Sequence, residues 1–204
     1  MKHATSRELY EYWERIRGSA RAPLRSAIEP SDIRKVLADT FILEVVNRET
    51  YQVRLAGTRI CAAYGREIKG QNFLDLWTGE DRQAMATLAA AVCEDAAAAV
   101  LTLGWTTERE RCLTAELLLL PLRQGDKGCD RILGSLAPFE RPYWLGSEPV
   151  VRQPIASLRL VWPSERQNLK RRASDRPQNG PAILFPIDQS RRRGHLFVLD
   201  GGKD

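Results

Sequence analysis

The sequence predicts an α+β fold, in which a five-stranded antiparallel sheet carries helices on one face. Strand-like segments form a hairpin near residue 50 and three consecutive runs between residues 99 and 139, with helix-spaced segments between them. Seven prolines after residue 141 interrupt any regular element. We therefore expect N-terminal helices over 1–39, a central domain over 40–140, and an irregular, basic, partly disordered extension over 141–204.

The N-terminal region is predicted to be helical. Residues 5–17 form the first helix, because Thr5 and Glu8 have the spacing of a capping box and Gly18 is a suitable stop. A short helix is expected at 31–38. The first helix has an apolar face that is expected either to lie on the outer face of the sheet or to form a dimer seam. This face carries Leu9, Tyr12, Trp13 and Ile16.

The central region alternates between helical and strand periodicity. A helix is expected at 58–64 and a further turn at 73–77. The tetrad 78–81 then opens a longer helix, in which Met85, Leu88, Ala89 and Val92 repeat at helical spacing. Hairpin-length connections make the last three strands antiparallel neighbours. The expected strands cover residues 41–46, 51–56, 99–106, 112–122 and 132–139.

Composition limits the class of protein. No apolar run reaches the roughly 18 residues that a membrane helix needs, and the charged N-terminus is unlike a secretory signal. We therefore expect a soluble, cytoplasmic protein with no membrane association. The formal net charge is +5, and residues 141–204 hold 12 Lys and Arg against 6 Asp and Glu. Binding to nucleic acid would depend on this extension, where the basic groups at 170–172 and 191–193 lack a reading module.

The extension also contains two apolar segments. Residues 155–162 and 195–199 are each rich in Leu, Val and other large apolar residues. We expect them to dock on the domain or on a partner, and we expect residues 164–180 to be disordered.

The sequence carries no catalytic signature. Nucleophile-elbow, metalloprotease, Walker and dinucleotide-binding motifs are all missing, and the two histidines, His3 and His195, lie near the chain ends. We therefore expect a protein that is not an enzyme. No C-x-x-C pair is present, so we expect no metal site, and the four cysteines are expected to be reduced and mostly buried.

The order of the elements and one loop resemble the PAS domain family. The loop at 65–77, G-R-E-I-K-G-Q-N-F-L-D-L-W, is similar to the PAS pattern of two spaced glycines and an aromatic before an acidic pair. The preceding R-L-A-G-T at 54–58, followed by G-R-E-x-x-G, resembles alphaproteobacterial PAS proteins once classed as a domain of unknown function. Gly57 and Gly70 lie where the chain changes direction, which favours a positive φ or a close backbone approach. The resemblance covers roughly residues 5–140.

The resemblance implies a regulatory domain with a small cavity, but it leaves the cofactor unknown. Haem-binding PAS domains use an axial His from the helical segment, and residues 4–194 contain none, although Cys61 is still conceivable as a ligand. Light-oxygen-voltage (LOV) domains carry a reactive Cys in G-R-N-C-R-F-L-Q, where this chain has Phe73. Haem and a LOV-type flavin adduct are therefore disfavoured, and non-covalent flavin is left open.

Five residues are candidate ligand contacts. Arg54 would bind an anionic ligand if its face of the strand lines the cavity, and it would form an ordinary ion pair if that face is outward. The three aromatic candidates would contact a ligand or fill the core. The candidate set is Arg54, Thr58, Tyr64, Trp77 and Trp105.

Two functions follow as hypotheses. The first is a non-catalytic sensing or protein-interaction module that acts in trans through a small-ligand cavity and the N-terminal helix. It would act as a homodimer or on a signalling partner. The alternative is an adaptor with a self-filled cavity, which binds an acidic partner or nucleic acid through the basic extension.

Overall fold

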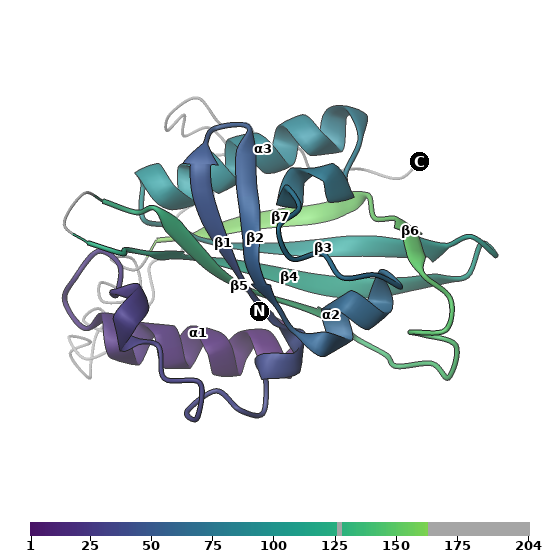
Figure 1. Ribbon diagram of the computed structural model, residues 1–204, viewed down its shortest axis with the longest axis horizontal. Coiled ribbons are helices and arrows are strands. Elements are labelled where there is room, and N and C mark those ends of the chain that lie inside the picture. The colour runs from purple at the N-terminus through teal and green to yellow at the C-terminus, as the bar shows by residue number, and fades with distance from the viewer. Residues whose placement is uncertain (126–127, 163–204) are drawn as a thin grey trace, which may run out of the picture.

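A computed structural model describes residues 1–125 and 128–162 of the chain. It confirms the α+β class, with one curled antiparallel sheet in the order β2-β1-β5-β4-β3-β6 and β7 also paired to β3 (Figure 1). The described residues form seven strands, two more than the sequence predicts. The strands are β1 (Thr40–Asn47), β2 (Thr50–Ala56), β3 (Ala98–Thr107), β4 (Cys112–Leu122), β5 (Arg131–Pro138), β6 (Val150–Arg152) and β7 (Ile155–Val161).

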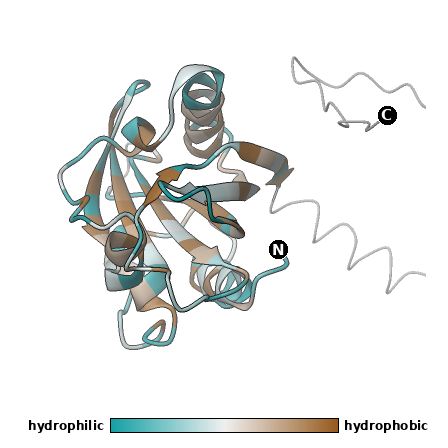
Figure 2. Cartoon of the chain, turned by 90° about the vertical axis from the view of Figure 1, so that its right-hand side faces the viewer, coloured by the Kyte–Doolittle hydropathy of each residue, from teal (hydrophilic) through white to brown (hydrophobic). Residues whose placement is uncertain are grey.

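Helices lie over the inner face of the sheet as predicted, and the N-terminal helix covers the outer face, one of the two places expected for it. The helix α1 lies on one side of the sheet and α3 on the other (Figure 1), and the turned view shows hydrophobic strand segments between them (Figure 2). The α-helices are α1 (Ala4–Arg17), α2 (Thr58–Ala63) and α3 (Gly79–Glu94). The 3-10 helices are η1 (Arg25–Ala27), η2 (Leu37–Asp39) and η3 (Phe73–Leu76).

Strand β4 shows how the two cores form. Its side chains alternate between two buried clusters, because successive residues of a strand point to opposite faces. Ala115, Leu117 and Leu119 join the inner cluster with α2, η3 and α3. Leu118, Leu120 and Leu122 join the outer cluster with α1. The strand predicted at 112–122 is confirmed.

The helix α1 uses its apolar face against its own sheet. Leu9, Tyr12 and Trp13 are buried in the outer cluster, and Ile16 packs against it partly buried. Of the two expectations for this face, the structure therefore shows the packing on the outer sheet. Homodimerisation stays a prediction that needs another surface.

The start of α1 differs from the predicted capping box. His3 is the N-cap, and its Nδ1 accepts a hydrogen bond from the Thr5 N–H at 3.1 Å. The buried carboxylate of Glu116 on β4 accepts the N–H groups of Lys2 at 2.7 Å and His3 at 3.0 Å. A contact with the sheet, distant in sequence, therefore fixes where the helix begins. Gly18 ends it as predicted, with φ of 57°.

The predicted helix at 31–38 is a series of turns that ends in η2. Its first hydrogen bonds join residues three apart, from Ile33 to Pro30 at 3.3 Å and from Val36 to Ile33 at 2.9 Å. A helix this short gains little from its own hydrogen bonds, so packing decides the conformation. Ile33 and Val36 are still buried as expected.

The extra strands β6 and β7 lie where the sequence predicts an irregular extension. Both run antiparallel to β3, and β7 pairs with it from Ala98↔Val161 to Leu103↔Ile155. The apolar segment at 155–162 therefore docks on the domain, while the predictions for 164–180, 170–172, 191–193 and 195–199 fall outside the described residues.

Alkaline pH is expected to destabilise the fold through Tyr51 on β2. Burial raises the pKa of this fully buried phenol from 10 to about 12. The unfolded chain therefore ionises first, so the stability that depends on the neutral phenol is fully present below pH 10 and is lost between pH 10 and 12. The loss is about 2–3 kcal/mol. Urea denaturation at several pH values should show a shallower alkaline decline in Tyr51→Phe than in the wild type. A decline as steep as that of the wild type would contradict this assignment, and Tyr143→Phe, at an exposed position, is the control.

Candidate functional site

A buried amide, Gln153, joins three parts of the fold at one end of the sheet. Its Oε1 accepts hydrogen bonds from the Tyr64 hydroxyl at 2.5 Å and from the Trp105 indole N–H at 3.2 Å. Its Nε2 donates to the Leu76 carbonyl at 3.1 Å. Two donors and one acceptor fix which way the amide points. Gln153 therefore connects the end of α2, strand β3 and helix η3.

A kink in the edge strand aims Gln153 inward. The pairing with β3 shifts register between Thr106 and Thr107, and again between Thr102 and Leu103. Gln153 and Pro154 lie between these two irregularities, and the Pro154 carbonyl accepts the Gly104 N–H at 3.0 Å. An irregularity of this kind re-aims side chains. Gln153 is consequently 4% exposed although its neighbour Arg152 is exposed.

A surface cleft of about 330 Å³ opens beside this amide. A volume near 300 Å³ is at the small end of ligand sites in proteins. Burial raises the pKa of the Tyr64 phenol above its usual range, and the Gln153 hydrogen bond and the nearby Arg66 charge act in the opposite direction. The phenol is therefore a neutral donor at physiological pH. The lining is formed by Tyr64, Arg66, Asp75, Leu76, Glu108 and residues 149–153.

One wall of the cleft forms where the end of α2 packs against Pro149. Gly65 has a φ of +62°, and a Cβ built on it would lie 3.1 Å from the Cβ of Pro149. The chain thus turns out of α2 directly against the segment that leads into β6. This contact places Arg66 beside the residues that precede Gln153.

Two of the five predicted ligand contacts meet at this site. Tyr64 and Trp105 share the Gln153 amide, and their rings meet edge to face with centroids 6.1 Å apart. Trp77 lies in the inner core, 5.1 Å from the Phe73 ring, and its buried indole N–H has no hydrogen-bond partner among the described residues. Thr58, at the start of α2, is exposed and does not line the cleft.

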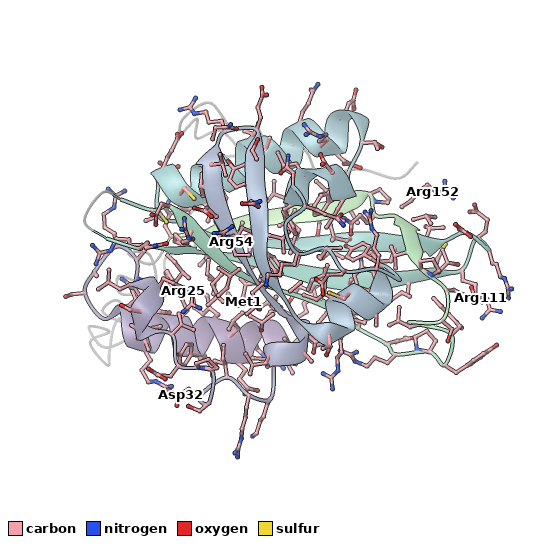
Figure 3. All side chains as sticks on the ribbon, in the orientation of Figure 1. Met1, Arg25, Asp32, Arg54, Arg111 and Arg152 are labelled. Atoms are coloured by element: carbon pink, nitrogen blue, oxygen red, sulfur yellow. The ribbon has the colours of Figure 1, made fainter. Side chains whose placement is uncertain are left out.

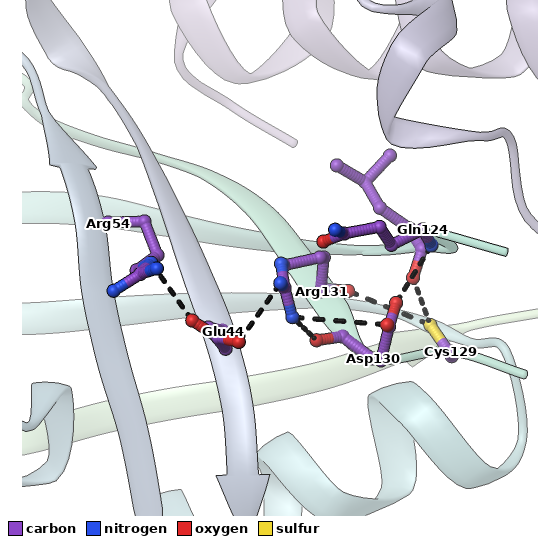
Figure 4. A network of polar contacts seen from close by, with 7 residues as sticks. Glu44, Arg54, Gln124, Cys129, Asp130 and Arg131 are labelled. Carbon is purple, nitrogen blue, oxygen red and sulfur yellow. Dashed lines mark hydrogen bonds and ion pairs between the residues drawn. The ribbon is translucent and has the colours of Figure 1, made fainter.

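Arg54 faces outward and forms an ion pair, which is the second of the two alternatives given for it. The register shift between Ile42 and Leu43 leaves Arg54 as the extra residue of a bulge on β2. Its guanidinium pairs with Glu44 at 2.9 Å, and Glu44 also pairs with Arg131 at 3.0 Å, which continues the network across β1 and β5 (Figure 4). Arg54 therefore stabilises the outer face and does not reach the cleft.

Sequence reasoning missed Gln153, the residue that organises the site. It stands in a proline-rich stretch between Pro149 and Pro154 that offered no strand pattern. The signal that was available is the apolar run from residue 155, since a strand there brings the preceding residues to the end of the sheet.

Phe73, at the position of the LOV cysteine, is enclosed by aromatic rings. Its ring stacks on Phe41 with centroids 5.0 Å apart and meets Trp77 edge to face. The expectation against a LOV-type adduct stays a prediction.

The four cysteines are free thiols, and their burial differs from the expectation. Cys61, Cys93 and Cys129 are partly buried, and Cys112 is exposed. Cys61 donates to a Glu67 carboxylate oxygen at 3.4 Å, and burial raises its pKa. Within residues 1–125 and 128–162, no group of three or more His, Cys, Asp or Glu side chains is placed to hold a metal ion. No helix in this part of the chain has the length and apolar character to cross a membrane.

An antiparallel sheet with short helices over its inner face encloses one core and leaves the polar cleft at its end. The sequence model of a PAS domain family matches residues 1–137. The chain therefore belongs to the PAS domain family, which makes it a regulatory, sensory type of module. The finer assignment to an alphaproteobacterial subfamily stays a prediction. The comparison with curated proteins returns no match.

Solved structures with a similar fold include several LOV proteins. A LOV domain studied with a flavin analogue is 13% identical, with 72% of this chain and 94% of that chain covered and a TM-score of 0.43. The Rhodobacter sphaeroides LOV protein is 20% identical, with 57% and 71% covered and a TM-score of 0.41. An RNA-binding LOV receptor is 14% identical, with 74% and 38% covered and a TM-score of 0.42. These similarities concern the fold alone.

Proposed function

We propose that this chain is a non-catalytic PAS sensor in which a small molecule in the cleft controls the position of the β6–β7 edge. The sensor acts in trans on a separate partner. The observation that carries this proposal is the Gln153 amide, which lines the cleft and at the same time lies in the link between β6 and β7. A ligand that competes for its hydrogen bonds changes the balance between two positions of that edge.

The edge strand is suited to transmit such a change. Both β6 and β7 pair with the sheet through β3, and β7 is largely exposed along its length. Its displacement leaves the other strand pairs intact. The β6–β7 edge then transmits the signal in place of α1, which is packed over the outer face. Nothing in the described part of the chain favours the adaptor alternative.

Hydrogen exchange tests the link between the amide and the edge. Gln153→Leu leaves the Tyr64 hydroxyl and the Trp105 indole without an acceptor, each at a cost of about 1–3 kcal/mol. Amide exchange should therefore accelerate at least about tenfold in residues 150–161 and stay unchanged in α1. The control is Gln83→Leu, at an exposed position of α3.

An equal acceleration in α1 and β7 would mean that Gln153 supports the fold as a whole, which contradicts local control. Unchanged exchange in 150–161 would contradict the proposal as well. Native mass spectrometry of the purified chain, before and after denaturation, reports separately whether a small molecule is retained.

A further inference from the structure

We infer that the cleft binds a small zwitterion, a molecule with one carboxylate and one ammonium group of the amino-acid type. This inference rests on the proposed function, since it names the ligand class of the same cleft. It follows from the charges on the cleft wall, from the hydrogen-bonding capacity left in its floor, and from its size.

The charged side chains of the wall divide into two sets. Arg152 is already bound to Glu110 through contacts of 2.6 and 2.8 Å, and Asp75 pairs with Arg82 at 3.2 Å. Figure 3 shows Arg152 projecting at the same end of the molecule as Arg111. These charges are therefore compensated within the chain.

One cation and one anion of the wall are left. Arg66 and Glu108 both line the cleft, and neither side chain has a hydrogen-bonded or ion-paired partner within residues 1–125 and 128–162. They do not pair with each other, so both charges are available to a ligand in the cleft. A guanidinium binds a carboxylate in a two-point fork, and a carboxylate binds an ammonium group.

The buried floor of the cleft adds directional contacts. Gln153 uses one of its two amide hydrogens on the Leu76 carbonyl, and the Tyr64 oxygen donates once, which leaves it free to accept. The second amide hydrogen of Gln153 can donate to a carboxylate, and the Tyr64 oxygen can accept from an ammonium group.

Charge balance and size select against other ligand classes. Glu108 on the wall, which has no ion-paired partner among the described residues, would repel a polyanion such as a nucleotide. A cleft of about 330 Å³ holds a small molecule. A ligand with both charges satisfies Arg66 and Glu108 together, and a simple anion or amine satisfies only one of them.

Titration of the full-length chain with a graded series tests the ligand class. Glycine, β-alanine, 4-aminobutyrate, 6-aminohexanoate and leucine separate the two charges by different lengths or add an apolar side chain. Calorimetry and tryptophan fluorescence should show saturable binding for at least one of them. Acetate and ethylammonium, each with a single charge, should bind at least about tenfold more weakly.

Two variants locate the binding. Arg66→Gln and Glu108→Gln should each weaken the best ligand at least about tenfold, while Arg34→Gln, an exposed position before β1, should leave it unchanged. All of these side chains are exposed, so the variants fold. Binding of acetate as strong as that of the best amino acid, unaltered affinity in both variants, or no saturable binding in the series would overturn the inference.

The two proposals fail in different ways. If Gln153→Leu loosens residues 150–161 but no zwitterion binds, only the ligand class is wrong. If a zwitterion binds through Arg66 and Glu108 without changing exchange in 150–161, the ligand class holds and the sensory mechanism is wrong.

Discussion

Trp13→Ala is expected to lower the free energy of unfolding by about 3–5 kcal/mol, because it empties the centre of the outer core. Trp13 is fully buried, and its indole N–H donates to the Pro121 carbonyl at 2.8 Å. Its ring lies 5.9 Å from that of Tyr10, and the Arg17 guanidinium covers it at 5.4 Å. The variant loses this packing and leaves the Pro121 carbonyl without its donor.

Chemical denaturation at two protein concentrations measures this loss. The structure places Trp13 against its own sheet, so the loss should be independent of concentration. Tyr143→Ala is the matched control, since that ring is 89% exposed and its removal should cost less than about 0.5 kcal/mol. A loss in Trp13→Ala that shrinks on dilution would instead indicate a dimer seam, because dimerisation stabilises the wild type more at higher concentration.

Strong periodicity made most of the fold predictable. The strand at 112–122 is a long apolar segment between turns, and the helix that carries Met85 and Val92 repeats at helical spacing, so both could be assigned from the sequence. In a regular helix or strand, the spacing of apolar residues shows which side chains are buried.

Irregularities in the strands hid the candidate site. A bulge adds one residue and inverts the faces that follow, so the alternation around Arg54 could not decide between cavity and surface. The same effect at β6 turned Gln153 inward. Prolines at 149, 154 and 163 suggested an irregular segment, yet prolines are tolerated at the ends and kinks of an edge strand.

A buried carboxylate outside the loop holds the start of α2 in place. Asp39, 2% exposed at the side chain, binds Arg59 at 2.8 Å and Arg141 at 2.7 Å. It thereby fixes the start of α2 and the segment that leaves β5. No spacing rule joins these three residues, because they are brought together only by the folded sheet.

Gly57→Ala is expected to destabilise the fold by about 3 kcal/mol or more, since the added methyl group meets backbone that cannot turn away. A Cβ on Gly57 would lie very close to the carbonyl oxygens of Leu37 and Ala38. The Gly57 N–H donates to the Thr40 carbonyl at 2.8 Å, which holds the two segments together.

The two glycines of the signature serve different purposes. Gly57 has an ordinary φ of −67°, so its requirement is the close approach of the η2 backbone. Gly70 has a φ of +84° and open space around it, so Gly70→Ala should cost only the strain of the left-handed region, about 1–2 kcal/mol.

Urea denaturation of three variants separates these reasons. Gly104→Ala is the control for Gly57→Ala, because its Cβ would lie an ordinary 3.8 Å from the Pro154 Cγ. The expected order of destabilisation is Gly57→Ala, then Gly70→Ala, then Gly104→Ala. If Gly57→Ala were as mild as Gly104→Ala, η2 would have to move away from α2. The Asp39–Arg59 ion pair would then lengthen, which would mean that the contact between η2 and the start of α2 can shift without unfolding.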